Sequence, residues 1–346
     1  MIRIQNIYYM LAYAFQVLNE QGYKNIATEE FDNTAELCAA ILARGISTQV
    51  KRGLGKEYIP QTEALSSLRG KLDISESIKT QTFLKKQMIC SYDDFSVNSV
   101  MNRIIKSTVL LLLKGDISKS RKKELRKLMV FFEDVDTVDL YSVNWNMQYN
   151  RNNQTYRMLI SICYLVFKGL LQTQSDGTTK LMDFLDEQRM HRLYEKFILE
   201  YYRKEHPELT ANASQIPWQL DDDFGDMLPV MQTDIMLTKD EKTLIIDAKY
   251  YAHTTQRQYD KNTLHSGNLY QIFTYVKNKE AELAEKPHKV AGMLLYARTD
   301  EEIYPEKEYR MSGNQIGVRT LNLDGDFDLI KNQLDEIVEN YFMEAA

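Results

Sequence analysis

The sequence predicts a protein of mixed helix and sheet, with an amino-terminal helical domain that holds a small β region and a carboxy-terminal α/β domain. The chain has 346 residues, whereas a typical domain has about 150. Apolar residues at helical spacing dominate the first half, and strand-like apolar runs alternate with helical stretches in the second. The polar, glycine-containing run at residues 172–179 separates the two halves. The predicted domains are therefore residues 1–175 and 176–346.

The first half begins with two predicted helices, at residues 7–18 and 35–44. The aromatic side chains of the first helix fit one helical face, which favours a role in the core over ligand binding. Residues 50–78 follow as a predicted region of short strands and turns, punctuated by Gly53, Gly55, Pro60 and Gly70. A glycine-rich, charged, strand-like segment of this kind either projects from its domain or forms ordinary surface hairpins.

Two more helices are predicted at residues 97–113 and 120–132. The first contains the apolar run at residues 109–113, which is far shorter than the roughly 20 residues that cross a membrane. We therefore expect a buried core helix there. The second carries the densest basic cluster of the chain: Lys119, Arg121, Lys122, Lys123, Arg126 and Lys127. A solvated helix face is the favoured interpretation, and contact with a DNA backbone or an acidic partner is the alternative.

The composition restricts the classes of function. A formal net charge of −6 argues against a protein whose whole surface grips nucleic acid, although it leaves room for a local DNA-binding cleft. Cys38, Cys90 and Cys163 are widely spaced, which is typical of buried free thiols in a reducing compartment. The five histidines lack the spacing of a zinc site. Without a signal peptide or lipidation motif, the chain is expected to be cytoplasmic and not bound to a membrane.

The most informative segment of the second half is a predicted β-hairpin. Residues 244–251 are rich in Ile and Tyr and follow the polar cluster Thr-Lys-Asp-Glu-Lys-Thr, which is typical of a turn. We expect residues 230–238 to form the antiparallel partner strand, with the turn centred between Asp240 and Glu241. Residues whose numbers sum to 481 then lie opposite each other. Asp234 is therefore expected to face Asp247.

This hairpin predicts a metal-dependent site. Side chains alternate along a strand, so Asp247 and Lys249 share one face. Opposed carboxylates on Asp234 and Asp247 would have Cβ atoms about 5 Å apart and would repel each other. Mg²⁺, which binds one or two carboxylates together with waters and phosphate oxygens, would offset that repulsion. Lys249 would then hold a scissile phosphate or help to deprotonate a water. The alternative is a solvated strand face on which Lys249 neutralises Asp247.

Helices are predicted on both sides of this hairpin in the sequence. Residues 182–204 form a predicted helix before it, and residues 268–279 a helix after it. Buried strands at residues 291–297 and 317–323 and a closing helix at residues 327–342 complete the predicted domain. The expected order is helix, strands, helix, strand, strand, helix.

This order and the acidic hairpin resemble the PD-(D/E)xK nuclease fold, in which the metal-binding acids lie on a central hairpin of a mixed sheet. Asp234 and the Asp247-Ala-Lys249 tripeptide match the motif, with Thr233 where the fold's nominal proline would stand. The resemblance implies that Glu195 is an extra metal-binding acid from the preceding helix and that Gln271 approaches from the following one. An exposed helical position is the alternative for Glu195.

A closer resemblance extends over the whole chain. The segments at residues 4–14, 102–108, 233–235 and 247–251 are together similar to the McrC family. This resemblance implies a Mg²⁺-dependent DNA endonuclease subunit of a 5-methylcytosine-type, modification-dependent restriction system. It further implies that the chain binds and stimulates a McrB-like AAA+ GTPase ring and acts on double-stranded modified DNA. The oligomeric state is open from the sequence, and a dimer in the assembled complex is the simplest way to bring two nuclease sites together for cutting both strands. The chain itself has only Arg52-Gly-Leu-Gly-Lys56, which lacks the spacing of a nucleotide-binding loop.

Residues 50–78 are the candidate for the part that reaches into the ring, with ordinary surface hairpins as the alternative. Two other functions remain open from the sequence. One is a non-catalytic adaptor or regulator of a ring NTPase, because the first half carries no recognisable chemistry. The other is a stand-alone DNA repair nuclease of the same fold.

Overall fold

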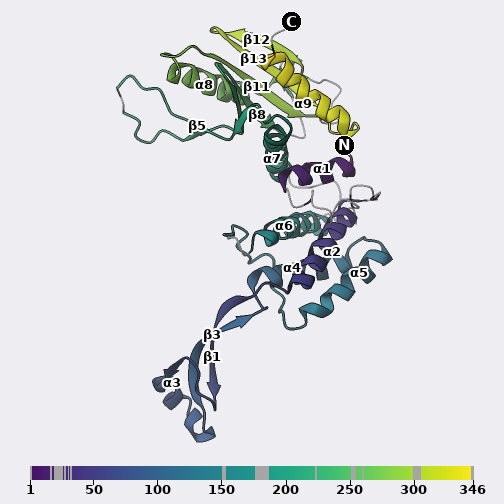
Figure 1. Cartoon of the computed structure of the whole chain (residues 1–346), viewed down its shortest axis with the longest axis vertical. Helices are drawn as coiled ribbons and strands as arrows, with labels where there is room; N and C mark the ends of the chain where they lie inside the picture. Colours follow the sequence, from purple (N-terminus) through teal and green to yellow (C-terminus); the bar gives the residue numbers. More distant parts are fainter. Residues whose placement is uncertain are drawn as a thin grey trace. The chain divides into compact units, whose positions relative to one another are not determined.

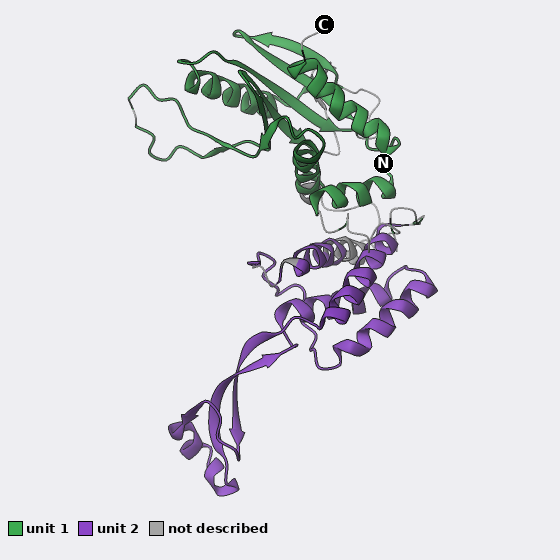
Figure 2. Ribbon diagram, viewed as in Figure 1, with its two compact units in different colours: residues 1–31, 184–346 green, residues 32–183 purple. Residues whose placement is uncertain are grey.

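The computed structural model describes two compact units. The described residues are 2–15, 18, 26, 29, 31, 33–149, 153–175, 187–222, 224–250, 255–258, 261–298 and 305–343. Unit 1 comprises Met1–Phe31 and Phe184–Ala346, and unit 2 comprises Asp32–Asp183 (Figure 2). The predicted division into residues 1–175 and 176–346 differs from these units, because the first 31 residues cluster with the carboxy-terminal part of the chain.

Unit 2 contains a group of helices whose apolar faces form its core. These helices are α2 (Thr34–Arg52), α4 (Val100–Lys114), α5 (Lys119–Met129) and α6 (Gln154–Ser175). The predicted helix at residues 35–44 continues to Arg52 and ends only at Gly53, whose positive φ of 87° favours glycine. The run at residues 172–179, predicted as a linker, begins inside α6, and residues 176–179 lie outside the described part of the chain.

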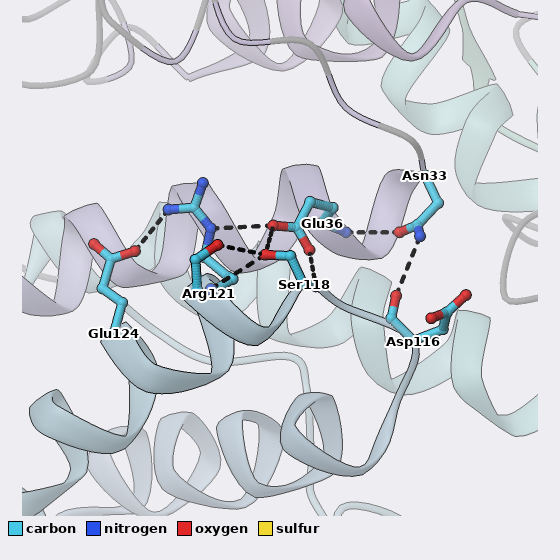
Figure 3. Close-up of polar contacts among 7 residues, drawn as sticks. Asn33, Glu36, Asp116, Ser118, Arg121 and Glu124 are labelled. Atoms are coloured by element: carbon cyan, nitrogen blue, oxygen red, sulfur yellow. Dashed lines mark hydrogen bonds and ion pairs between the residues drawn. The ribbon is translucent and has the colours of Figure 1, made fainter.

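A polar network connects the start of α2 with the start of α5 (Figure 3). The carboxylate of Glu36 accepts hydrogen bonds from the backbone N–H and the hydroxyl of Ser118, each at 2.8 Å. Arg121 forms ion pairs with Glu36 at 3.5 Å and with Glu124 at 2.7 Å. This member of the basic cluster therefore serves the internal structure, whereas four others are exposed: Lys119, Lys123, Arg126 and Lys127.

A three-stranded sheet extends from these helices, and we call residues 57–96 the arm (Figure 1). Its strands are β1 (Glu57–Leu65), β2 (Lys71–Asp73) and β3 (Met88–Ser96), with β3 in the centre and both neighbours antiparallel to it. It also contains α3 (Ile74–Lys79) and a 3₁₀ turn, η3 (Thr82–Lys85). The predicted β region at residues 50–78 is confirmed for β1 and β2. It is wrong for residues 50–52 and 74–78, which are helical, and it missed β3.

The root of the arm is attached to the helices by two polar side chains, Asn102 and Tyr156. The amide of Asn102 on α4 donates to the carbonyl oxygens of Gly55 at 2.9 Å and Val97 at 2.8 Å. The hydroxyl of Tyr156 on α6 donates to Asn102 Oδ1 and accepts the Gly55 N–H at 2.7 Å. Asn102 is fully buried, so these bonds fix the backbone just before β1.

Unit 1 is built on a six-stranded mixed sheet, as predicted, in the order β12-β13-β11-β8-β7-β4. Its strands are β4 (Thr210–Asn212), β7 (Ile235–Lys239), β8 (Lys242–Lys249), β11 (Lys289–Ala297), β12 (Lys307–Met311) and β13 (Asn314–Leu321). Strand β11 runs parallel to β8 and β13, and the other pairs are antiparallel. Two short two-stranded sheets flank it: β5 (Gln215–Ile216) with β6 (Met231–Gln232), and β9 (Thr255–Gln258) with β10 (Lys261–Leu264).

Helices cover both faces of the central sheet, with α8 and α9 on opposite sides (Figure 1). The helices of unit 1 are α1 (Ile4–Ala14), α7 (Glu187–Glu205), α8 (Ser266–Glu282) and α9 (Phe327–Phe342). The bounds of α9 match the prediction at both ends. The apolar side chains of β8 and β11 pack under α8 in one core with Ile272 and Val276. Among the described residues, no helix is long and apolar enough to cross a membrane.

Helix α1 belongs to unit 1 because its side chains bind segments near the other end of the chain. The amide of Asn6 donates to the carbonyl oxygens of Leu323 and Gly325, each at 2.8 Å. Tyr9 stacks on Phe327 of α9 with ring centroids 4.3 Å apart. These contacts explain why a contiguous division near residue 175 does not follow the compact units.

Candidate active site

The β7–β8 hairpin has the predicted register. Ile235 pairs with Ile246 and Lys239 with Lys242, so opposed residue numbers sum to 481. The turn lies between Asp240 and Glu241, and Asp240 adopts the left-handed conformation with φ 52°. Asp234 stands one residue before β7, and its Oδ2 accepts the N–H of Ala248 at 3.0 Å. The predicted proximity of Asp234 to the Asp247 segment is therefore confirmed.

Asp247 and Lys249 are buried on this hairpin. Their exposed fractions are 1% and 7%, so the interpretation as a solvated strand face is wrong. The Nζ atom of Lys249 forms an ion pair with Oδ1 of Asp247 at 3.0 Å. Burial of two charged side chains is costly, and it is tolerated only where they are paired or serve a function. Tyr251, predicted on the same face, lies outside the described residues.

The two carboxyl groups perturb each other's ionisation. Burial, the neighbouring Asp247 and Glu195 together raise the pKa of Asp234 to about 7. Burial also raises the pKa of Asp247, against the opposing positive charge of Lys249. In the protein without a bound cation, the pair therefore retains a proton at pH values where separate aspartates are fully ionised.

The donor set at this pair fits a magnesium ion. Both carboxylate oxygens of Asp247 are buried; Oδ1 is paired with the Lys249 ammonium at 3.0 Å, whereas Oδ2 has no hydrogen bond from the residues that the structure describes. A divalent cation would satisfy them and would neutralise the repulsion with Asp234. The described side chains contain no group of three or more His, Cys, Asp and Glu that would enclose a metal ion. Two carboxylates completed by waters and phosphate oxygens are what Mg²⁺ requires, whereas zinc requires more protein ligands.

Lys249 is held by a chain of hydrogen bonds from α8. Its Nζ atom donates to Oε1 of Gln271 at 3.3 Å, and Nε2 of Gln271 donates to the hydroxyl of Tyr275 at 3.0 Å. The Tyr275 hydroxyl donates in turn to the carbonyl oxygen of Gln232 at 3.1 Å. That carbonyl can only accept, so it fixes the direction of each bond in the chain. Gln271 was predicted from the sequence, whereas Tyr275 was missed, although its spacing of four residues from Gln271 places both on one helical face.

Helix α7 brings a second polar pair toward the carboxylates. Glu195 and His191, one turn earlier, form an ion pair with Nδ1 and Oε1 2.6 Å apart. The Glu195 side chain is 27% exposed, so it is neither a core residue nor a fully solvated one. Its predicted role as a metal ligand stays a prediction. His191 was missed, although the four-residue spacing was visible in the sequence. Residues 182–186 of the predicted helix lie outside the described part of the chain.

Comparison with known proteins places the chain in a family. The model of the family described as McrBC 5-methylcytosine restriction system component matches residues 4–297. The chain belongs to the McrBC family. The matched range includes α1, the arm and the β7–β8 hairpin, so the resemblance inferred from the sequence motifs is confirmed.

Similar proteins include one bacterial relative and two archaeal assemblies. The Type IV methyl-directed restriction enzyme EcoKMcrBC of Escherichia coli (strain K12) is 29% identical over 346 residues, which cover 98% of each chain. A structure of Thermococcus gammatolerans McrB AAA+ hexamers with bound McrC gives a TM-score of 0.49 and 16% identity, over 95% of this chain and 75% of that one. The Thermococcus gammatolerans McrBC complex gives 0.41 and 20% identity over 58% of each chain. The protein described here is thus a component of a McrBC restriction system.

Proposed function

We propose that the chain is the nuclease subunit of its restriction system and cleaves double-stranded DNA containing 5-methylcytosine with the help of Mg²⁺. The observation that carries the proposal is the buried carboxylate of Asp247 beside the half-buried one of Asp234, with the ammonium group of Lys249 3.0 Å from Asp247. Burying an acid and a lysine in a strand does not help the protein to fold, because both side chains lose their hydration. The order of elements around this pair supports a PD-(D/E)xK fold for unit 1.

Each residue of the site has a distinct task in this proposal. Asp234 and Asp247 would hold Mg²⁺, with Glu195 as a third acid. When bound there, the cation would polarise the phosphoryl oxygen and lower the pKa of an attacking water. Lys249 stands beside Asp247 and would neutralise charge that develops on the scissile phosphate. Gln271 keeps the Lys249 ammonium directed at the site, because its Oε1 atom accepts from Nζ.

We further propose that the arm docks on a McrB-like AAA+ GTPase ring and stimulates it. The arm exposes several large apolar side chains: Tyr58, Leu68, Leu72, Ile74, Ile78, Phe83, Leu84 and Phe95. Exposed apolar surface of this extent is typical of a protein interaction site. Its attachment through Asn102 and Tyr156 would transmit force from the ring to the helices instead of letting the arm swing. The membership of the McrBC family supports this partner.

Asp247→Ala in the whole chain tests the nuclease assignment. The variant is assembled with the ring GTPase from the same restriction system and given GTP, Mg²⁺ and DNA with or without 5-methylcytosine. We expect no cleavage by the variant and unchanged stimulation of GTP hydrolysis. Asp240→Asn is the matched control, because Asp240 is an exposed acid of the same hairpin whose left-handed backbone suits asparagine.

The outcomes separate the proposed function from its alternatives. Full cleavage by Asp247→Ala would contradict the assigned chemistry. Absence of cleavage by the wild-type assembly, with normal stimulation of GTP hydrolysis, would favour a purely regulatory role. The regulatory alternative has one observation in its favour, because residues 32–183 form a compact unit separate from the acidic hairpin. Cleavage by the chain without ring or nucleotide would favour the stand-alone repair nuclease.

A further inference from the structure

The hydroxyl group of Tyr275 connects the two sides of the acidic site. It donates to the carbonyl oxygen of Gln232 at 3.1 Å and accepts from Nε2 of Gln271 at 3.0 Å. Gln232 ends β6, two residues before Asp234. Gln271 in turn contacts the ammonium group of Lys249 at 3.3 Å. One side chain of α8 therefore joins the backbone beside one acid to the lysine beside the other.

The Tyr275 hydroxyl has a fixed position. The ring belongs to the apolar core under α8, together with Ile272 and Val276, and the residue is 9% exposed. A hydroxyl on a closely packed ring moves little, because rotation about the ring axis leaves it in place. The carbonyl group of Gln232 can only accept, so the hydroxyl proton is directed to it. The oxygen of the hydroxyl is then the acceptor for Gln271.

The Gln271 side chain, in contrast, has no fixed position of its own. It is half-buried, it rotates about three bonds, and a half-turn of its amide exchanges the oxygen and the nitrogen. In the turned orientation its NH₂ group would face the ammonium group of Lys249, donor against donor. The hydrogen bond to Tyr275 holds Nε2 and leaves Oε1 directed at Lys249.

The amide oxygen of Gln271 holds the Lys249 ammonium group without neutralising it. Lys249 Nζ already contacts Oδ1 of Asp247 at 3.0 Å. A second carboxylate would cancel the positive charge, whereas a neutral amide accepts a hydrogen bond and leaves the charge in place. Loss of the Gln271 oxygen would let the ammonium group move further onto Asp247, where it competes with a cation for the carboxylate.

We propose that Tyr275 is a positioning residue, which holds the Gln271 amide with its oxygen toward Lys249 and so keeps the ammonium group directed at the scissile phosphate. This inference rests on the proposed nuclease function. Tyr275 acts through Gln271 and does not itself touch DNA or metal. Loss of one orienting hydrogen bond is expected to slow catalysis by about 10-fold.

Tyr275→Phe removes the hydroxyl and keeps the packed ring. In the assembled complex with the ring GTPase, GTP, Mg²⁺ and DNA containing 5-methylcytosine, we expect kcat for cleavage to fall by about 10-fold and KM for DNA to stay unchanged. Mn²⁺ binding to the whole chain, measured by isothermal titration calorimetry, should match wild type, because both acids remain in place. Tyr270→Phe is the matched control, since this ring is 68% exposed on the same helix, and it should cleave as wild type.

Combination with Gln271→Leu decides whether Tyr275 acts through Gln271. Gln271→Leu should itself slow cleavage, and Tyr275→Phe should cause no further loss in that background. Losses that multiply in the double variant would show an independent role and would overturn the inference, as would a normal kcat for Tyr275→Phe alone. Weaker Mn²⁺ binding by Tyr275→Phe would also overturn it, because the hydroxyl would then support Asp234 through the Gln232 backbone.

A measurement without DNA separates this inference from the proposed function. In ¹⁵N spectra of the whole chain with labelled lysine, the ammonium signal of Lys249 is the one that Lys249→Gln lacks. We expect slow hydrogen exchange of this signal in wild type and in Tyr270→Phe, and faster exchange in Tyr275→Phe and Gln271→Leu. An unchanged signal in Tyr275→Phe, or no such signal in wild type, would overturn the inference. The expected spectra together with normal cleavage by Lys249→Gln would overturn the catalytic role of the lysine and leave its positioning by Tyr275 intact.

Discussion

Two antiparallel pairings of the molecule, β7–β8 and β1–β3, place their side chains in opposite ways. In β7–β8, Asp247 and Lys249 are buried to 1% and 7% exposure. In β1–β3, Tyr58 and Phe95 are 72% and 53% exposed. Folding alone favours the reverse in both places, since charged groups gain from hydration and aromatic groups gain from burial. Each strand pair therefore carries a cost that folding does not explain. We expect an external partner at each: a cation and DNA at β7–β8, and another protein at β1–β3.

The strongest test of this contrast removes the buried charge next to Asp247. Lys249→Gln should lower DNA cleavage by the assembled complex by about 100- to 1,000-fold, the range found when one group that stabilises transition-state charge is lost. Mn²⁺ binding should persist, because the carboxylates remain. Lys239→Gln, on the partner strand of the same hairpin, should cleave normally. Normal cleavage by Lys249→Gln would make the buried lysine a structural counter-ion.

The second test uses pH to measure how much the raised pKa of Asp234 lowers the free energy of unfolding. The pKa of Asp234 is raised from an ordinary value of 3.8 to about 7. Below pH 3.8, the folded and the unfolded chain both hold the proton on Asp234, so this group does not change the free energy of unfolding. As pH rises further, the unfolded chain releases it first, and the free energy of unfolding of the metal-free protein falls until about pH 7.

We expect a loss of about 4 kcal/mol between pH 4 and pH 8 from this group, measured by urea denaturation of the metal-free protein. Asp234→Asn should flatten this part of the profile. Mg²⁺ should stabilise the wild-type protein more at pH 8 than at pH 5, since it takes the place of the retained proton. An identical profile for wild type and Asp234→Asn would show that the Asp234 carboxylate ionises freely.

The third and smallest effect concerns the exposed aromatic pair of the arm. Tyr58→Ser with Phe95→Ser should change the free energy of unfolding by less than about 0.5 kcal/mol per site, because these rings are largely solvated. The same variant should weaken binding to the ring GTPase by about 10-fold or more, as interface aromatics usually do. Fluorescence anisotropy with labelled protein gives this affinity. Val130→Ser, at an exposed apolar position outside the arm, should bind normally.

Local rules were sufficient to predict the acidic hairpin. The polar turn at Asp240 and the alternation of side chains set the register, and a buried strand that contains two charges indicated a site. The end of α9 was likewise predicted from the local sequence alone. The extent of α2 was underestimated because its polar end, residues 45–52, lacks a clear apolar stripe although no residue before Gly53 ends the helix.

Other features depended on contacts between distant segments. Strand β3 contains Asp93 and Asp94, so its central position in the arm was not visible before its partners were known. Tyr275 is linked to Lys249 only through Gln271, and a spacing of four residues on a helix is too common to single it out. The membership of α1 in unit 1 rests on its bonds to Leu323 and Gly325, more than 300 positions along the chain.

That attachment of α1 has a consequence for the order in which the protein is made. During synthesis, α1 leaves the ribosome before unit 2, yet the carbonyl groups of Leu323 and Gly325 that Asn6 binds are translated only after unit 2 is complete. Tyr9, which stacks on Phe327 in the finished molecule, therefore lacks this partner until the start of α9 has been translated. Unit 2 can fold in that interval as an insertion within an unfinished unit 1. The arm is thus complete before the β7–β8 hairpin has been translated.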